Sequence, residues 1–180
     1  MSLVIGLKVA DRVLIAGDSI ALSGPTYQPD EPKVERRGDY VVGMTGSSTT
    51  YHAFCHEADD AKDWFHPGYL RGIVLDLART LNALKAEGLR DGDSAEVQMA
   101  LLIARGRRHL FVLNEEGQLW PAGPYQAIGQ GDQVATYLLR KGYREDMTVD
   151  EAVALAQTVI AEVATVTPFV KLPVTWMVTE

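Results

Sequence analysis

The chain has few of the features that mark secreted, membrane or nucleic-acid-binding proteins. Its single cysteine, Cys55, excludes an intrachain disulfide. Acidic residues outnumber basic ones by 24 to 17, and the net charge of -7 argues against the basic face that nucleic acid requires. No apolar run approaches the roughly 20 residues that span a bilayer, and the first residues lack the pattern of a signal peptide. These absences predict a cytoplasmic protein without nucleic-acid or membrane partners.

What is present is the composition of an ordinary globular protein. The 180 residues are 47% hydrophobic and 23% charged, which suits a chain with a substantial apolar core. No internal repeat and no low-complexity segment divides the sequence. We therefore expect one domain that covers residues 1–180.

Apolar spacing predicts the secondary structure. Short β-branched and apolar runs indicate strands, and apolar residues three or four apart indicate helices. The segment from Gly24 to Pro32 has no periodic pattern and is expected to be a loop. Strands are expected near residues 3–9, 12–16, 33–36, 40–45, 97–104, 109–114 and 172–178. Helices are expected from Gly46 to about residue 66, over 69–87, from Asp132 and from Thr148.

Three of the expected helices carry further signals. The helix over 69–87 has a single apolar stripe, and the helix from Asp132 directs apolar residues inward. Thr148 followed by Glu151 forms a capping box at the start of the last helix. The stripe consists of Leu70, Ile73, Val74, Leu77, Leu81 and Leu84, and the inward residues after Asp132 are Val134, Leu138 and Leu139.

The order of elements is strands, two helices, strands, two helices and a final strand. Separate runs of strands and helices indicate an α+β protein. Two antiparallel sheets packed face to face, with a helix pair outside each, would bury every predicted apolar stripe. We therefore expect a four-layer αββα sandwich.

Ser2 is the residue that suggests a chemical activity. Removal of Met1 would leave Ser2 with a free α-amine, which titrates near pH 8, and such a serine can serve as both nucleophile and base. Serine after Met1 is common, so the hypothesis depends on spacing downstream. Asp18 ends the second strand, Lys33 opens the third, and Gly46 lies in a glycine turn that enters a helix.

This pattern resembles the proteasome β-subunit family and its bacterial relative, the HslV peptidase. Members have a nucleophile at the mature N-terminus, a strand closing in Ala-Gly-Asp or Ala-Ala-Asp, a lysine and a Gly-x-x-Gly turn. Here Ala16-Gly17-Asp18, Lys33 and residues 43–46 match these segments, and residues 127–131 and 142–152 extend the likeness to nearly the whole chain. The resemblance implies the N-terminal nucleophile (Ntn) hydrolase fold, which is the same four-layer sandwich.

The resemblance also implies a role for each matched residue. Lys33 would lower the pKa of the Ser2 nucleophile and help to move its proton, and Asp18 would keep Lys33 charged and oriented. The Gly46 N–H would donate to the oxyanion of the tetrahedral intermediate. Ala21 and Met44 match positions that line the specificity pocket, and an apolar Met44 suggests tolerance for hydrophobic side chains.

The implied function is that of an endopeptidase subunit that needs no metal and no organic cofactor. Its substrate would be a peptide or an unfolded protein. Members of the family assemble into stacked hexameric or heptameric rings with the active sites inside. The resemblance therefore implies a homo-oligomeric ring and an ATP-dependent unfoldase as partner.

The sequence departs from the family pattern in two places and leaves two other functions open. The nucleophile is Ser2 where the family has threonine, and Gln130 replaces a serine that contacts the terminal amine. If Met1 is retained, the Ser2 nitrogen is an amide and cannot act as a base. The chain would then be a catalytically inactive ring or scaffold subunit of the same fold. A small-molecule amidase of the wider Ntn class is the other alternative.

Other motifs give weaker signals. His52 and His56 lie four residues apart, with Cys55 and Asp59 nearby, but two helical histidines do not make a zinc site without a third ligand. We therefore expect a solvated or ring-interface face there and no metal. The segment Gly129-Gln130-Gly131 lacks the strand, helix and acidic partner of a dinucleotide site.

Overall fold

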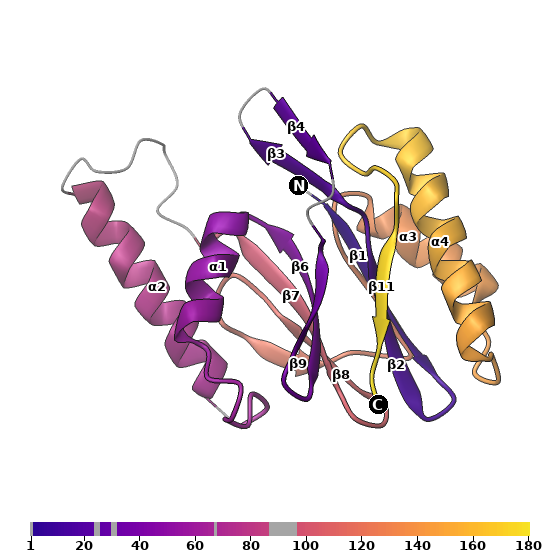
Figure 1. The fold of residues 1–180 in the computed structure, drawn as a ribbon, viewed down its shortest axis with the longest axis horizontal. Helices are drawn as coiled ribbons and strands as arrows, with labels where there is room; N and C mark the ends of the chain where they lie inside the picture. Colours follow the sequence, from indigo (N-terminus) through magenta and orange to yellow (C-terminus); the bar gives the residue numbers. More distant parts are fainter. Residues whose placement is uncertain (1, 24–25, 30–31, 67, 87–96) are drawn as a thin grey trace.

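Two antiparallel sheets stack between two pairs of helices in the computed structural model, which describes residues 2–23, 26–29, 32–66, 68–86 and 97–180 (Figure 1). The first sheet has the order β10-β1-β2-β11, and the second has the order β5-β6-β7-β8-β9. The predicted α+β class and the four-layer arrangement are confirmed. The strands of the first sheet are β1 (Leu3–Val9), β2 (Arg12–Gly17), β10 (Tyr125–Gly129) and β11 (Thr175–Val178). Those of the second sheet are β5 (Val34–Arg37), β6 (Tyr40–Gly46), β7 (Met99–Arg105), β8 (His109–Leu113) and β9 (Leu119–Pro121).

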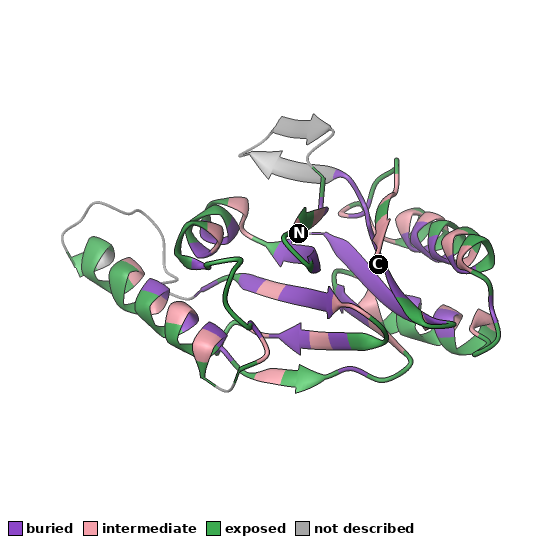
Figure 2. Ribbon diagram, turned by 60° about the horizontal axis from the view of Figure 1, so that its bottom comes forward, coloured by how far each residue is buried: buried purple, intermediate pink, exposed green. Residues whose placement is uncertain are grey.

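Each helix pair covers the outer face of one sheet. Helices α1 (Ser48–Glu57) and α2 (Tyr69–Ala86) pack on the second sheet, and α3 (Asp132–Gly142) and α4 (Val149–Val166) pack on the first. Alternation along the strands sends one set of side chains to the helices and the other set between the sheets. Ile15 and Val41 belong to the core between the sheets, while Leu14 faces α3 and α4. Figure 2 shows the buried strands inside and the exposed outer faces of the helices.

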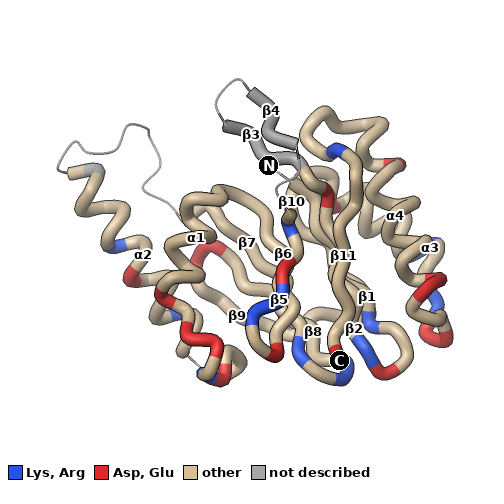
Figure 3. The backbone as a smooth tube through the Cα atoms, in the orientation of Figure 1, with Lys and Arg blue, Asp and Glu red and all other residues tan. Residues whose placement is uncertain are grey.

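Charged residues of both signs gather at the end of the sandwich that lies opposite the N-terminus (Figure 3). Exposed ion pairs connect the turns at this end, among them Arg107–Asp11 and Arg108–Glu145. Exposed pairs of this kind contribute little to stability. The end that holds the N-terminus is the one where the predicted site residues converge. No helix among the described residues is long and apolar enough to cross a membrane.

The predicted loop over Gly24–Pro32 contains a strand, so that prediction was wrong. Strand β4 (Thr26–Pro29) pairs with β3 (Ile20–Ser23) as an antiparallel hairpin. Residues 24, 25, 30 and 31 lie outside the described part. The pairing is made by backbone groups of a short strand without an alternating pattern, and sequence periodicity does not detect such strands. The final strand also begins later than predicted, at Thr175 and not at Leu172.

The first helix ends earlier than its apolar spacing predicts. It stops at Glu57, and Ala58 takes an extended conformation while its N–H still bonds to the Phe54 carbonyl. The next residue, Asp59, donates its N–H to the Tyr69 hydroxyl, and its carbonyl accepts from the Trp64 indole. These contacts with residues further along the chain replace the next helical turn.

Two predicted inward residues face solvent. Val134 is 41% exposed because α3 instead buries Ala135 and Leu139, which lie four residues apart. Leu84 is 36% exposed, so the stripe on α2 is buried only over its first part. The positions of Leu138 and Leu139 against the first sheet agree with the prediction.

The predicted capping box is present at the start of α4. Thr148 Oγ1 accepts from the Glu151 N–H at 3.2 Å, and Glu151 Oε2 accepts from the Thr148 N–H at 2.8 Å. We expect Thr148→Ala to reduce the free energy of unfolding by about 1 kcal/mol, measured by urea denaturation. Thr158→Ala on the exposed face of the same helix is the matched control, with a change within about 0.5 kcal/mol. Equal losses in both variants would contradict the capping role.

Candidate active site

Ser2 lies directly before β1 and is 1% exposed. Its carbonyl accepts a hydrogen bond from the Gln130 N–H at 2.8 Å. The next residue, Leu3, pairs with Gly129 across β1 and β10. The backbone of the predicted nucleophile is therefore held by the end of β10. Met1 lies outside the described residues.

Asp18 follows β2 and is completely buried. One carboxylate oxygen accepts from the Leu3 N–H at 3.0 Å, and the other accepts from the Lys171 N–H at 3.3 Å. The Asp18 N–H donates in turn to the Leu3 carbonyl at 3.1 Å. Backbone donors of this kind offset the cost of burying a carboxylate. Asp18 is thus tied to the residue that follows Ser2.

Lys33 is 3% exposed and lies directly before β5. A Cβ atom built on Gly17 would lie 3.0 Å from the Lys33 Cβ, so the lysine stem packs against the backbone just before Asp18. Its carbonyl accepts from the Met44 N–H at 2.8 Å, which fixes it to β6 as well. A glycine at position 17 leaves the room that this approach needs.

Gly46 is the last residue of β6 and directly precedes the N-cap of α1. The N-cap is Ser47, whose Oγ accepts from the Thr50 N–H at 3.3 Å. A helix N-terminus carries partial positive charge. A Cβ on Gly129 would clash with the Ser2 carbonyl and lie 2.8 Å from the Thr45 Cγ2. The end of β6, the end of β10 and Ser2 therefore meet at one place.

The two predicted pocket residues lie differently. Met44 is buried in the core between the second sheet and α1, where Tyr51 and Phe54 also lie. Ala21 belongs to β3, and its side chain lies outside the described part of the structure.

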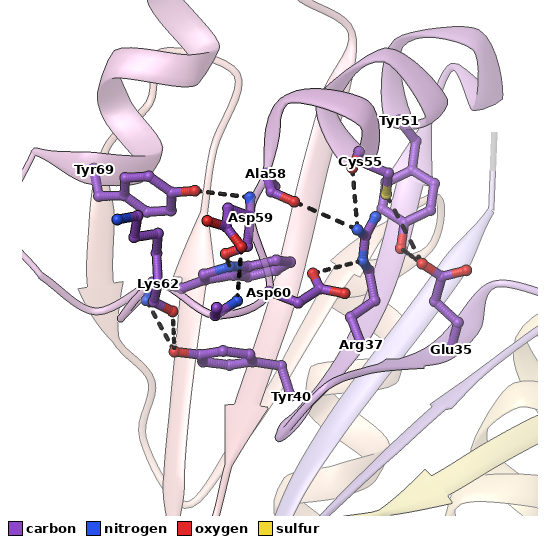
Figure 4. A network of polar contacts seen from close by, with 12 residues as sticks. Glu35, Arg37, Tyr40, Tyr51, Cys55, Ala58, Asp59, Asp60, Lys62 and Tyr69 are labelled. Atoms are coloured by element: carbon purple, nitrogen blue, oxygen red, sulfur yellow. Dashed lines mark hydrogen bonds and ion pairs between the residues drawn. The ribbon is translucent and has the colours of Figure 1, made fainter.

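A polar network links β5 to α1 beside this core (Figure 4). The Tyr51 hydroxyl donates to Glu35 at 2.5 Å, and the Cys55 thiol lies 3.8 Å from the same carboxylate oxygen. Arg37 donates to the Cys55 carbonyl at 3.0 Å and pairs with Asp60. Burial, followed by the hydrogen bond to Glu35, raises the pKa of Tyr51, and burial raises the pKa of Cys55. Burial thus favours the protonated form of both groups, and the network joins the sheet to the helix.

This network does not extend to a metal site. His56 is exposed and pairs with Glu57 at 3.2 Å. Within the described residues, no three histidine, cysteine or acidic side chains are grouped so that they could hold a metal ion. A protonated Cys55 thiol is also a poor metal ligand.

Sequence reasoning did not find the backbone groups that hold the site. The amides of Leu3 and Lys171 bind Asp18, and the Gln130 backbone, whatever its side chain, binds Ser2. Backbone donors carry no signature in residue type. Only the pairing of β1 with β10 and the path of the chain before β11 bring them to the site.

The chain shares sequence with known proteasome subunits. The sequence profile of the Proteasome family, whose description is "Proteasome subunit", matches residues 2–170 of this chain. The proteasome subunit alpha of Metallosphaera sedula is 34% identical over 159 residues. The aligned region covers 84% of this chain and 65% of that protein, so the chain spans about two thirds of its relative's length.

Solved structures share the fold over almost the whole chain. BPH from Thiobacillus denitrificans, solved in complex with epoxomicin, is 22% identical with a TM-score of 0.73, and the match covers 99% of this chain and 98% of that one. The Anbu (Gly-1) mutant from Hyphomicrobium sp. strain MC1 is 14% identical with a TM-score of 0.75. That match covers 100% of this chain and 82% of the other. At these identities the likeness concerns the fold.

Proposed function

The chain belongs to the proteasome subunit family, and from this premise we propose that it is a peptidase subunit that cleaves peptide bonds through Ser2 after loss of Met1. The observation that carries the proposal is the hold on the peptide bond that joins Ser2 to Leu3. Its carbonyl is bound by the Gln130 N–H, and the next amide is bound by buried Asp18, beside which Lys33 packs. An attacking group held in place in this way loses little entropy on reaction.

The reaction follows from these groups. The Ser2 Oγ attacks the carbonyl carbon of the substrate and passes its proton to the freed α-amine, with the buried Lys33 ammonium nearby to stabilise the developing charge. The tetrahedral intermediate collapses to an acyl-enzyme on Ser2, and the leaving amine takes the proton. Water then attacks the ester carbonyl and gives a proton to the α-amine. The ester bond breaks, the peptide acid leaves, and the Ser2 Oγ takes back the proton.

The Gly46 N–H is proposed as the donor to the oxyanion of both intermediates. It lies at the end of β6, directly before the N-cap of α1, so the positive end of the helix is close. The loss of one such donor typically removes about 3 kcal/mol of transition-state stabilisation. Ala21 and Met44 are proposed to line the specificity pocket, which would favour an apolar residue before the cleaved bond.

The remaining features of the proposal rest on the family. We propose that residues 1–180 act as one domain and assemble into a homo-oligomeric ring in the cytoplasm. The substrates would be peptides or unfolded proteins delivered by an ATP-dependent unfoldase. The residues of the site can perform the reaction without a metal or an organic cofactor.

A scaffold subunit without activity is the second candidate. Two observations favour it: the curated relative is named a proteasome subunit alpha, and Gln130 stands where the peptidases of the family have a serine. While Met1 is present, the Ser2 nitrogen is a peptide amide. A subunit that keeps Met1 would have a nucleophile without its base.

Mass spectrometry of the intact protein, before and after treatment with epoxomicin, distinguishes the two candidates. This epoxyketone is the ligand of the solved Thiobacillus denitrificans BPH complex. We expect loss of Met1 and one adduct, mapped to Ser2. A retained Met1 with no adduct would refute the peptidase and favour the scaffold. Loss of Met1 without adduct, together with hydrolysis of small amides, would favour the amidase.

A further inference from the structure

Thr175, the first residue of β11, carries a buried hydroxyl without a partner. Among the side chains that the structure describes, its Oγ1 is the only buried oxygen or nitrogen that makes no hydrogen bond. A buried polar group without a partner destabilises the fold, and replacement by an apolar group of the same shape removes that cost. Valine has this shape, so the threonine hydroxyl at this position calls for a function.

The register of β11 shows where this hydroxyl points. Thr175 pairs with Gly17 of β2, and Met177 pairs with Ile15. Residues two apart on a strand share a face, and Met177 packs into the core between the sheets. The side chain of Thr175 therefore also faces the space between the sheets, beside Gly17.

Strand β5, at the edge of the second sheet, lies beside β11 across that space, and Lys33 directly precedes it. A Cβ on Gly17 would lie 3.0 Å from the Lys33 Cβ, so Lys33 packs against the direct neighbour of Thr175. At the other end of both strands, the Arg36 guanidinium donates to the Val178 carbonyl at 2.9 Å. The step from Lys33 to Arg36 and the step from Thr175 to Val178 cover the same number of residues. Strand β5 thus runs along β11 (Figure 3). The two contacts bring Lys33 level with Thr175.

We propose that Thr175 is a positioning residue for Lys33, and that its hydroxyl accepts a hydrogen bond from one buried water that the lysine ammonium binds. An ammonium has three donors and can serve further acceptors besides the partners it already has. A single buried water commonly bridges polar groups in such a place. The catalytic value of this contact rests on the proposed function, since it acts through Lys33.

The hydrogen bond would keep Lys33 charged and directed at the site. An acceptor stabilises the ammonium relative to the neutral amine. The Lys33 stem packs against Gly17, and the Asp18 carboxylate belongs to the next residue in the chain. Loss of Met1 would add the Ser2 amine to the proposed site. Glu35 is held by Tyr51 on the opposite face of the second sheet.

The NMR signal of Lys33 tests the proposal without relying on activity. The purified protein, its lysines labelled with carbon-13 at Cε, is followed by NMR, and Lys33→Arg identifies the Lys33 signal. We expect Thr175→Val to move the Lys33 Cε signal, because the water that the ammonium binds loses its acceptor on Thr175. Thr175→Ser keeps the hydroxyl and should restore the signal.

The outcomes separate this proposal from the proposed function. If a folded Thr175→Val variant leaves the Lys33 signal unchanged and gains thermal stability, the hydroxyl has no contact with Lys33 and the inference is overturned. An equal change of the signal in Thr175→Ser would overturn it as well, because the hydroxyl would not be the cause. An inactive protein that keeps Met1 would refute the peptidase, yet the Lys33 signal would still decide the role of Thr175.

Discussion

Replacement of Ser2 by alanine is expected to reduce peptide hydrolysis by about 10³-fold or more, as removal of the nucleophile does in other acyl-transfer enzymes. Alanine still permits loss of Met1, so the α-amine, Asp18 and Lys33 remain in place. The missing Oγ removes the atom that forms the acyl-enzyme. The measurement is kcat/KM for a blocked fluorogenic peptide amide with an apolar residue before the cleaved bond.

Ser2→Thr is the matched control for this variant. Threonine keeps the hydroxyl, permits Met1 removal and is the residue that the family uses, so activity should stay within about tenfold of the unmodified protein. Loss in the alanine variant with retention in the threonine variant assigns the reaction to the Ser2 hydroxyl. Activity that survives Ser2→Ala would place the nucleophile elsewhere and contradict the proposed mechanism.

Gly129→Ala is expected to destabilise the fold and disable the site together. Gly129 has a φ of +97°, and a Cβ there would clash with the Ser2 carbonyl. Left-handed strain costs about 1–2 kcal/mol, and overpacking adds about 1–3 kcal/mol. We expect a total loss of about 3 kcal/mol in urea denaturation. Displacement of Ser2 would also break its 2.8 Å hydrogen bond with Gln130 and prevent labelling by epoxomicin.

Gly68→Ala separates the clash from the backbone strain. Gly68 has a similar φ of +87°, but a Cβ there would meet no atom within 4 Å. Its alanine variant should therefore lose only about 1 kcal/mol and keep full labelling of Ser2. If both glycine variants lose the same stability and both are labelled, the contact between Gly129 and Ser2 is not critical.

Several elements could be predicted because their signals are local. The apolar runs of β1 and β2 and the spacing of Leu70, Val74 and Leu77 on α2 depend on periodicity alone. The capping box of Thr148 and Glu151 lies within four consecutive residues. Each of these features forms from neighbours in the sequence, whatever the rest of the chain does.

Other elements depend on partners far along the chain, and there the prediction fails. The first helix stops at Glu57 because Tyr69 and Trp64 bind the backbone of Asp59. Val134 faces solvent because the first sheet meets α3 along Ala135 and Leu139. In both cases a tertiary contact overrides the local pattern.

By itself, the sequence determined the four helices, most of the longer strands, the four-layer class and the residue types of the candidate site, because hydrophobic periodicity and chemical identity are properties of nearby or single residues. Only the tertiary structure decided what holds that site. Strand register and the path of the chain bring the Leu3 and Lys171 amides to Asp18. They also bring the Gln130 amide to Ser2 and place Thr175 opposite Gly17, against which Lys33 packs. Register depends on which strands meet, and that choice is made by the packing of the whole chain.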